Sequence, residues 1–346
     1  MIIYSKQSGN IPASIAKLET PIKMIIEHES ELITKIGGIS DLLFNIEKSN
    51  RFGETIVGGN EFNLFTATNE GEGAESESLA ASYEKFIEHI QFMKEFIISA
   101  EMMEDATYGI SADAKRRAEN FARAYYKTVN KICETALAMG TETSATYAKA
   151  ELDLTAPDGL SLFNKSHKYG ESGTQSNYFW GDIFGKGEGS ARVYSAETFE
   201  KALYDLSVKL RNMKDESGEP LGYNADTIIL PGNKPQLELI AKKVCGTYGC
   251  ECDSSSVHLG KWRVIVLPGW QPTADSIMVM SSEANRNLAG NMFFNRIPLT
   301  VTNWVDNHTG NYIWNGRCRF GVGFGNYKHI LLATDSATNV DKATKM

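Results

Sequence analysis

The strongest periodic pattern in the chain is a run of apolar residues at helical spacing between residues 111 and 139. Apolar positions that recur every three or four residues place one face of a helix in a core. Ser111 can cap the start of this helix, and Gly140 ends it. Most members of the apolar stripe are small, so a partner surface can approach closely: Ala114, Ala118, Phe121, Ala122, Tyr125, Val129, Ile132 and Ala136.

Three shorter segments have the same spacing. Thr20-Pro21 predicts the start of a helix that ends at Gly37-Gly38, because proline suits the first helical position. Ser195 can cap a helix over 195–213, and a further helix begins near Pro235 and ends at Gly246.

Short apolar runs between these helices predict strands. Residues 226–231, 261–268 and 276–281 are such runs, and with two of the helices they indicate a compact α/β domain over 195–282. Further strands are expected over 293–305 and 311–333, with DNHTG as the turn between them. Residues 141–190 read as loop-rich, and a polar, frayed tail is expected from Asp335 onward.

Residues 52–98 read as a long hairpin. The first limb is rich in β-branched and aromatic residues, and the polar, acidic middle, NEGEGAESES, is expected to be the solvated tip. The apolar spacing of the returning limb, residues 83–98, fits both a strand and a helix. An isolated two-stranded hairpin is marginal in water, so another molecule must stabilise it.

Three glycines alternate in the last predicted strand: Gly321, Gly323 and Gly325. A dinucleotide fingerprint needs a third glycine where Asn326 stands, and a helix directly afterwards. The even positions 312–324 carry aromatic and apolar side chains, so the three glycines share the opposite face of a strand. A row of glycines marks close approach by another backbone. We therefore predict close packing, and we expect the helix over 113–139 to cross this face.

Other residues that could carry chemistry have ordinary explanations. Cys245, Cys250, Cys252 and His258 lack the paired knuckles of a zinc site and read as reduced thiols in a helix end and loop. The four glutamates at the hairpin tip lack the Asp/Asn alternation of a calcium loop. No nucleophile elbow, P-loop or zinc-protease motif is present. We expect no catalytic residue, no bound metal and no cofactor.

Composition narrows the function further. The chain has 346 residues, is 42% hydrophobic and has a net charge of −8, from 43 acidic and 35 basic residues. Nucleic-acid binders usually have a basic surplus, so binding over the whole surface is not expected, although a local basic face remains open. An odd number of cysteines fits a reducing compartment. The sequence has neither a signal peptide nor a run of 18 apolar residues, so no membrane association is expected.

The order of these elements resembles that of the major capsid proteins of tailed phages, which have the Hong Kong 97-type shell fold. ASYEKFIEHIQFMKEFIISAEMMEDA resembles the return from that family's extended loop, and the helix that follows stands where the spine helix belongs. YNADTIILPGNKPQLELIAKKV and GKWRVIVLPGW resemble the axial domain. VTNWVDNHTGNYIWNGRCRFGVGFGNYKHILLA resembles the closing strands of the peripheral domain. The resemblance covers most of residues 50–333.

The resemblance implies an α+β fold and a division of the chain. The N-terminal arm would span 1–50 and the extended β-hairpin loop 51–98, with residues 83–98 as a strand. Residues 99–150 and 290–335 would form the peripheral domain, with the spine helix over 111–139. The axial domain would span 151–289, and 336–346 would be a polar tail.

The resemblance also implies the function and the partners. Copies of the chain would form hexamers and pentamers of an icosahedral shell that encloses DNA without reading its sequence. The shell would be a virion component assembled in the host bacterial cytoplasm, with a portal and a possible decoration protein. Residues 52–78 contain no lysine, so no covalent link through the loop is expected. Only about fifty residues precede the hairpin, so scaffolding would come from a separate protein, which Met1 favours, or the chain is already trimmed.

Charge suggests one contact between subunits. In the family, the extended loop lies over the peripheral domain of a neighbour. The acidic tip (Glu70, Glu72, Glu75 and Glu77) would then face basic residues near the start of the spine helix (Lys115, Arg116, Arg117 and Arg123). Ordinary solvated surfaces are the alternative for both groups, since exposed ion pairs contribute only ~0.2–1 kcal/mol.

Two other functions remain open from the sequence. An encapsulin-like compartment would use the same fold to hold a protein cargo. A soluble α/β enzyme built on residues 195–282 would instead be a small monomer or dimer.

Overall fold

The computed structural model describes residues 3–4, 13–59, 67–71, 73, 81–104, 112–169, 173–181, 195–216, 218–246, 258, 260–335 and 342–345. The chain divides into two compact units, each built from separate stretches of sequence. Unit 1 comprises Met1–Glu54, Ile87–Cys133 and Phe293–Val322. Unit 2 comprises Thr55–Phe86, Glu134–Met292 and Gly323–Met346.

Unit 1 is organised around a five-stranded sheet. Its strands run in the order β1 (Ile3–Tyr4), β14 (Asn291–Val305), β15 (Tyr312–Phe324) and β5 (Ile90–Ile98), and β2 (Asn45–Lys48) also pairs with β14. β15 and β5 are antiparallel, with Trp314 opposite Phe96 and Cys318 opposite Phe92. Aromatic rings therefore stack along one face of the sheet. The rings of Phe92 and Phe320 are 5.0 Å apart, and those of Phe96 and Trp314 are 6.0 Å apart.

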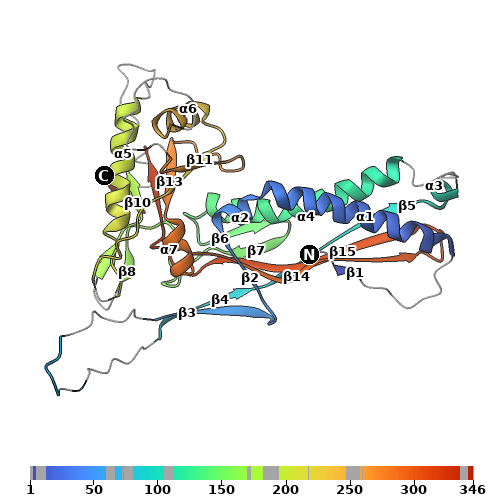
Figure 1. Cartoon of the computed structure of the whole chain (residues 1–346), viewed down its shortest axis with the longest axis horizontal. Coiled ribbons are helices and arrows are strands. Elements are labelled where there is room, and N and C mark those ends of the chain that lie inside the picture. The colour runs from blue at the N-terminus through green and yellow to red at the C-terminus, as the bar shows by residue number, and fades with distance from the viewer. Residues whose placement is uncertain are drawn as a thin grey trace. The chain divides into compact units, whose positions relative to one another are not determined.

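Two long helices, α1 (Ala13–Ile36) and α4 (Ala112–Ala138), lie side by side in unit 1 (Figure 1). They enclose its core with the sheet, through Ile22 and Ile26 of α1 and Ala118, Phe121 and Ala122 of α4. Two short helices, α2 (Ile39–Leu43) and α3 (Ala100–Glu104), follow α1 and β5. The helix expected over 111–139 is thus confirmed. Ser111, its expected cap, lies outside the described residues.

The start expected for the first helix is wrong. α1 spans Ala13–Ile36, so Thr20 and Pro21 lie within the helix instead of starting it. A capping residue before a proline is only a local signal, whereas packing of an amphipathic face supplies most of the stability of a helix in a protein. Ile22 and Ile26 are completely buried and hold this part of α1 in the core.

Unit 2 contains a six-stranded mixed sheet. Its order is β12 (Arg263–Leu267), β11 (Thr227–Pro231), β13 (Ser276–Met280), β16 (Ile330–Thr334), β10 (Tyr178–Trp180) and β17 (Thr344–Lys345). Helices α5 (Ala196–Arg211) and α6 (Pro235–Val244) bury apolar faces against it, among them Phe199, Leu203 and Leu237. The α-β-α-β-β order expected over 195–282 is confirmed, and a short helix, α7 (Ser282–Asn287), follows it.

Three small hairpins complete the described strands. They are β3–β4 (Gly53–Gly59 and Ala81–Glu88), β6–β7 (Ser144–Tyr147 and Ala150–Asp153) and β8–β9 (His167–Tyr169 and Gly173–Gln175). The limb over 83–98 is a strand, in β4 and β5, as the resemblance implies. The hairpins β6–β7 and β8–β9 lie in the stretch that the sequence presents as loops, because strands of three or four residues are too short to show a period.

The end of the chain differs from the expectation in two ways. β16 belongs to the sheet of unit 2, antiparallel to β13 and parallel to β10, and not to the sheet of β14 and β15. The expectation of a frayed tail is wrong for residues 342–345, because Thr344–Lys345 pairs with β10 and Ala343 is buried. Among the described residues, none of the helices combines the length and the apolar character that crossing a lipid bilayer requires.

Candidate functional site

The basic residues predicted near the start of the spine helix lie on the exposed side of α4. Lys115, Arg116, Arg117 and Arg123 are all exposed, whereas Ala118, Phe121 and Ala122 are buried in the core. The helical spacing of the apolar residues therefore holds the basic ones in solvent.

Three of these basic residues already contact carboxylates of their own chain at short range. Asp113 accepts from Arg116 at 2.7 Å and from Arg117 at 2.8 Å, and these two bonds lower the pKa of its carboxyl group. Arg123 donates to both oxygens of Glu29, at 3.0 and 3.1 Å, which raises the pKa of the guanidinium group. A carboxylate from a second subunit would have to share or displace these partners.

The acidic tip is only partly described. Glu70 is exposed, and Glu72, Glu75 and Glu77 lie outside the described residues. Pairing of the tip with the basic residues between subunits stays a prediction.

The three alternating glycines lie at buried positions at the end of β15. A Cβ atom on Gly321 would stand 2.8 Å from the carbonyl oxygen of Glu88 and 2.9 Å from His89. A Cβ atom on Gly325 would overlap the carbonyl oxygen of Ala289. Backbone therefore approaches both glycines closely. The helix is not the nearest neighbour of either one, so the partner expected for this face is wrong.

The spine helix instead meets β15 on the even-numbered face, at Gly316. A Cβ atom there would overlap the ring of Phe121 and stand 3.1 Å from Leu299. Sequence reasoning missed Gly316 because it considered only the row of odd glycines. The available signal was a single glycine between Trp314 and Cys318, inside an otherwise bulky stripe.

The base of the β3–β4 hairpin is fixed to the body of unit 2 by polar contacts. The buried ammonium group of Lys85 lies 2.5 Å from both Asp153 and Thr155, at the end of the β6–β7 hairpin. Partial burial raises the pKa of Asp153, but the bonds from Lys85 and Thr155 outweigh it and the pKa is lowered. Tyr83 accepts from Asn326 at 3.2 Å, and burial raises its pKa to about 12.

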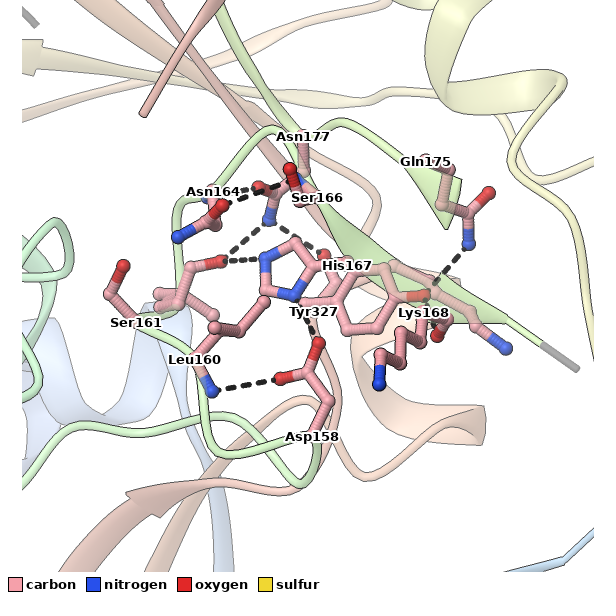
Figure 2. Close-up of polar contacts among 12 residues, drawn as sticks. Asp158, Leu160, Ser161, Asn164, Ser166, His167, Lys168, Gln175, Asn177 and Tyr327 are labelled. Carbon is pink, nitrogen blue, oxygen red and sulfur yellow. Dashed lines mark hydrogen bonds and ion pairs between the residues drawn. The ribbon is translucent and has the colours of Figure 1, made fainter. Parts of the chain in front are cut away.

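A second polar cluster surrounds His167, a completely buried residue of unit 2 (Figure 2). Its Nδ1 is 2.7 Å from Asp158, its Nε2 is 3.1 Å from the carbonyl oxygen of Leu162, and its ring stacks 3.9 Å from that of Tyr327. Asn177 donates to the carbonyl oxygens of Leu162 and Tyr327. Both imidazole nitrogens face oxygen atoms inside the protein, so neither is placed to exchange a proton with a substrate. The cluster joins two loops.

Burial raises the pKa of Asp158, but the hydrogen bond and charge of His167 together with backbone N–H groups outweigh it, and the pKa is lowered. Stability from this pair is therefore present above the pKa of an unfolded aspartate and is lost as the pH falls through the lower folded value.

The remaining candidate chemistry stays unsupported in the described part of the chain. Cys245 is buried, which raises the pKa of its thiol to about 11, and Cys250 and Cys252 lie outside the described residues. His258 accepts from Trp262 at 3.0 Å. Among the described residues, no three His, Cys, Asp or Glu side chains converge as metal ligands.

Large exposed apolar side chains concentrate in unit 1. On β5, Met93 and Ile97 are 58% and 45% exposed, on the opposite face from Phe92 and Phe96. The ring of Phe52 is 61% exposed, and the guanidinium group of Arg319 lies over it, 5.1 Å from its centre. Large apolar side chains that stay exposed in a unit are candidates for contact with another protein. The other exposed apolar residues of unit 1 are Met24, Leu32, Leu42 and Ile46.

Comparison with solved structures identifies the fold of this chain. No protein-family model and no curated protein matches the chain. The solved capsid of Myoviridae phage XM1 matches with a TM-score of 0.52 and 15% sequence identity, over 86% of this chain and 92% of that chain. The capsid of the native GTA particle matches with a TM-score of 0.49 and 14% identity, over 86% of this chain and 90% of that chain.

A phage-related protein from Bordetella bronchiseptica RB50 also matches, with a TM-score of 0.49 and 13% identity, over 90% of this chain and 96% of that chain. The fold assignment depends on the XM1 capsid, whose likeness extends over nearly the whole of both chains. The chain has the α+β, Hong Kong 97-type capsid fold, and the fold expected from the sequence is confirmed. The expected domain boundaries stay predictions.

Proposed function

We propose that this chain is a major capsid subunit of a tailed phage, which self-assembles into an icosahedral shell around double-stranded DNA. The observation that carries the proposal is the likeness to the XM1 capsid over 86% of the chain. The role is structural, and the proposal assigns the chain no reaction. This agrees with the His167 cluster, whose ring nitrogens are both occupied within the protein.

Physical features of the subunit support assembly with copies of itself. The β3–β4 hairpin forms a two-stranded sheet of its own, and such hairpins are marginal alone in water. Unit 1 also exposes Met24, Phe52 and Met93, each more than half accessible. Covering these groups on a neighbour removes apolar surface from water, which stabilises the assembly by about 25 cal/mol per Å².

Weak individual contacts are sufficient for such a shell. A contact with a millimolar Kd contributes about −4 kcal/mol, and each subunit makes several at once. Once the first contact has formed, the others form within one assembly, at a high effective concentration. Finite shells arise because repeated contacts between identical chains close on themselves.

The remaining assignments belong to the same proposal. The subunits form hexamers and pentamers, the shell is part of the virion, and assembly takes place in the host bacterial cytoplasm. The packaged DNA is contacted without reading its sequence. A separate scaffolding protein and a portal take part in assembly, and a decoration protein can bind outside.

Size-exclusion chromatography followed by negative-stain electron microscopy of the purified chain tests the proposal. We expect closed particles of uniform diameter that dissociate to subunits in denaturant. A compact monomer or dimer at high protein concentration would contradict assembly and favour an enzyme. Particles from infected or producing cells should contain DNA, and particles filled with a single protein cargo would instead indicate an encapsulin-like compartment.

A further inference from the structure

The exposed side of α4 carries a regular row of basic residues. Arg116, Asn120, Arg123, Lys127 and Lys131 follow one another at intervals of four, three, four and four residues, and all five are exposed. This spacing places them on one face of the helix, opposite the residues buried in the core. We call Arg116, Arg123, Lys127 and Lys131 the basic stripe.

Charge in this protein is unevenly distributed. α4 has six basic and three acidic residues, whereas the rest of the chain has 29 basic and 40 acidic residues. Of the three acidic residues of α4, Asp113 and Glu119 are half-buried, and Glu134 is buried three residues beyond Lys131, where the exposed row ends. α4 thus has a surplus of three positive charges in a chain of net charge −8. It is a local basic face, which the overall acidic composition does not exclude as a nucleic-acid contact.

Contacts within the chain leave much of this charge in solvent. The side chains of Arg116 and Arg123 remain 73% and 55% exposed although they pair with Asp113 and Glu29. Lys127 makes no ion pair within the described part of the chain. From Arg116 to Lys131 the stripe covers about 22 Å along the helix axis.

We propose that the basic stripe contacts the phosphate backbone of the DNA inside the shell. This inference rests on the proposed function, which supplies the DNA. The chemistry of the stripe favours a nucleic acid over a protein. Its five positions contain no apolar side chain, whereas protein interfaces have an apolar, charge-depleted centre. Interfaces with nucleic acid are polar and strongly positive, and successive cations along one line match a row of phosphates.

The acidic loop tip is the competing partner, because it is predicted to face Arg116 and Arg123. Lys127 and Lys131 separate the two possibilities, since they belong to the stripe but not to the predicted contact with the tip. The informative variant is therefore Lys127→Gln with Lys131→Gln. Lys201→Gln with Lys243→Gln, on the exposed sides of α5 and α6, removes the same charge elsewhere and is the matched control.

The experiment measures binding of the full-length subunit to a fluorescent 30-base-pair duplex of random sequence, at a series of salt concentrations. The slope of log K against log[salt] reports the phosphates neutralised, at about −0.9 for each. We expect the stripe variant to lose about two units of slope, and the control variant to keep the wild-type slope. Thermal unfolding of both variants verifies that they fold, and negative-stain microscopy records whether they form shells.

Each outcome shows whether the basic stripe contacts DNA. A smaller slope with normal shells supports contact with DNA. An unchanged slope in the stripe variant overturns the inference, and if shell formation is also lost, the stripe faces another subunit. Equal loss in the control variant also overturns it, because the binding would then follow net charge alone. Failure of the wild-type chain to form shells would contradict the proposed function, while the salt slope would still test the stripe.

Discussion

His329 is a completely buried histidine that the fold keeps neutral. It lies directly before β16, and its Nε2 is 2.8 Å from Asn291 Oδ1. A Cβ atom on Gly290 would stand 2.5 Å from the imidazole ring, so glycine is required for the ring to fit. Burial disfavours the charged ring and lowers the pKa of His329 to about 3. The fold therefore excludes a proton that an unfolded histidine accepts near pH 6.5.

This difference predicts the pH dependence of stability. The unfolded chain binds a proton at His329 below pH 6.5 and the folded chain does not, so the free energy of unfolding falls as the pH drops from 6.5 towards 3. Between pH 7 and pH 5 this residue alone should cost about 2 kcal/mol. The measurement is urea unfolding of the isolated subunit at both pH values. His329→Gln, which keeps a donor for Asn291, should lose about 2 kcal/mol less over that interval, and equal losses would contradict the assignment.

At the scale of residues, the sequence predicted that two glycines of β15 are closely approached, but it did not predict which residues approach them. The alternation of Gly321 and Gly325 with bulky residues indicated close approach, and the structure has backbone oxygens there. The identity of those neighbours depends on which strand and loop lie against β15. That is a property of long-range pairing, and a local pattern does not contain it. Gly316 illustrates the same limit, because its need for space arises from Phe121, almost two hundred residues earlier.

At the scale of elements, the β3–β4 hairpin is a two-stranded sheet that is held by contacts outside itself. Lys85 is buried and reaches Asp153 and Thr155 of the β6–β7 hairpin, so one small hairpin holds the base of another. The carboxylate of Asp153 is 58% exposed, and solvent screening makes such a pair modest in strength. The pair orients the hairpin, because it fixes the position at which β4 leaves the rest of unit 2.

Lys85→Met tests this anchor, since methionine keeps most of the alkyl chain and removes the ammonium group. We expect a loss of about 1 kcal/mol for local opening, which corresponds to roughly fivefold faster hydrogen exchange of β4 amides. Lys94→Met, at an exposed position of the neighbouring strand β5, is the matched control and should leave β4 unchanged. If β4 amides exchange at the same rate in both variants, Lys85 does not anchor the hairpin.

The sequence predicted elements well where they are long and periodic. α4 has about seven turns of consistent apolar spacing to define it, whereas β6 and β7 have four residues each and read as loops. For residues 83–98 the apolar spacing fits both a strand and a helix. Pairing with β15 makes β5 a strand. The start of α1 was missed for a related reason, because burial of Ile22 and Ile26 outweighs a local capping signal.

For the whole molecule, the element order carried more information than any motif. The proposed function requires no zinc site, triad or phosphate loop, because a shell subunit would act through contacts distributed over its exterior. Such a surface leaves only weak marks in a single sequence: apolar residues on the wrong face of a strand, such as Met93 and Ile97, and charge gathered on one helix. The contacts themselves belong to the assembly and are not encoded in any one local pattern.

The predicted contact between the loop tip and the spine helix is testable at this scale. Arg116→Glu with Arg117→Glu replaces two positive charges beside Asp113 with two negative ones and should repel an acidic tip, so we expect slower shell formation at low salt, measured by light scattering. Both arginines also bond Asp113, and the variant could lose stability for that reason alone. Adding Glu70→Lys and Glu72→Lys separates the effects, because it can restore the contact between subunits but not the lost bonds to Asp113. Recovered assembly at an unchanged unfolding temperature supports the contact. Normal assembly of the first variant, or no recovery in the second, removes it.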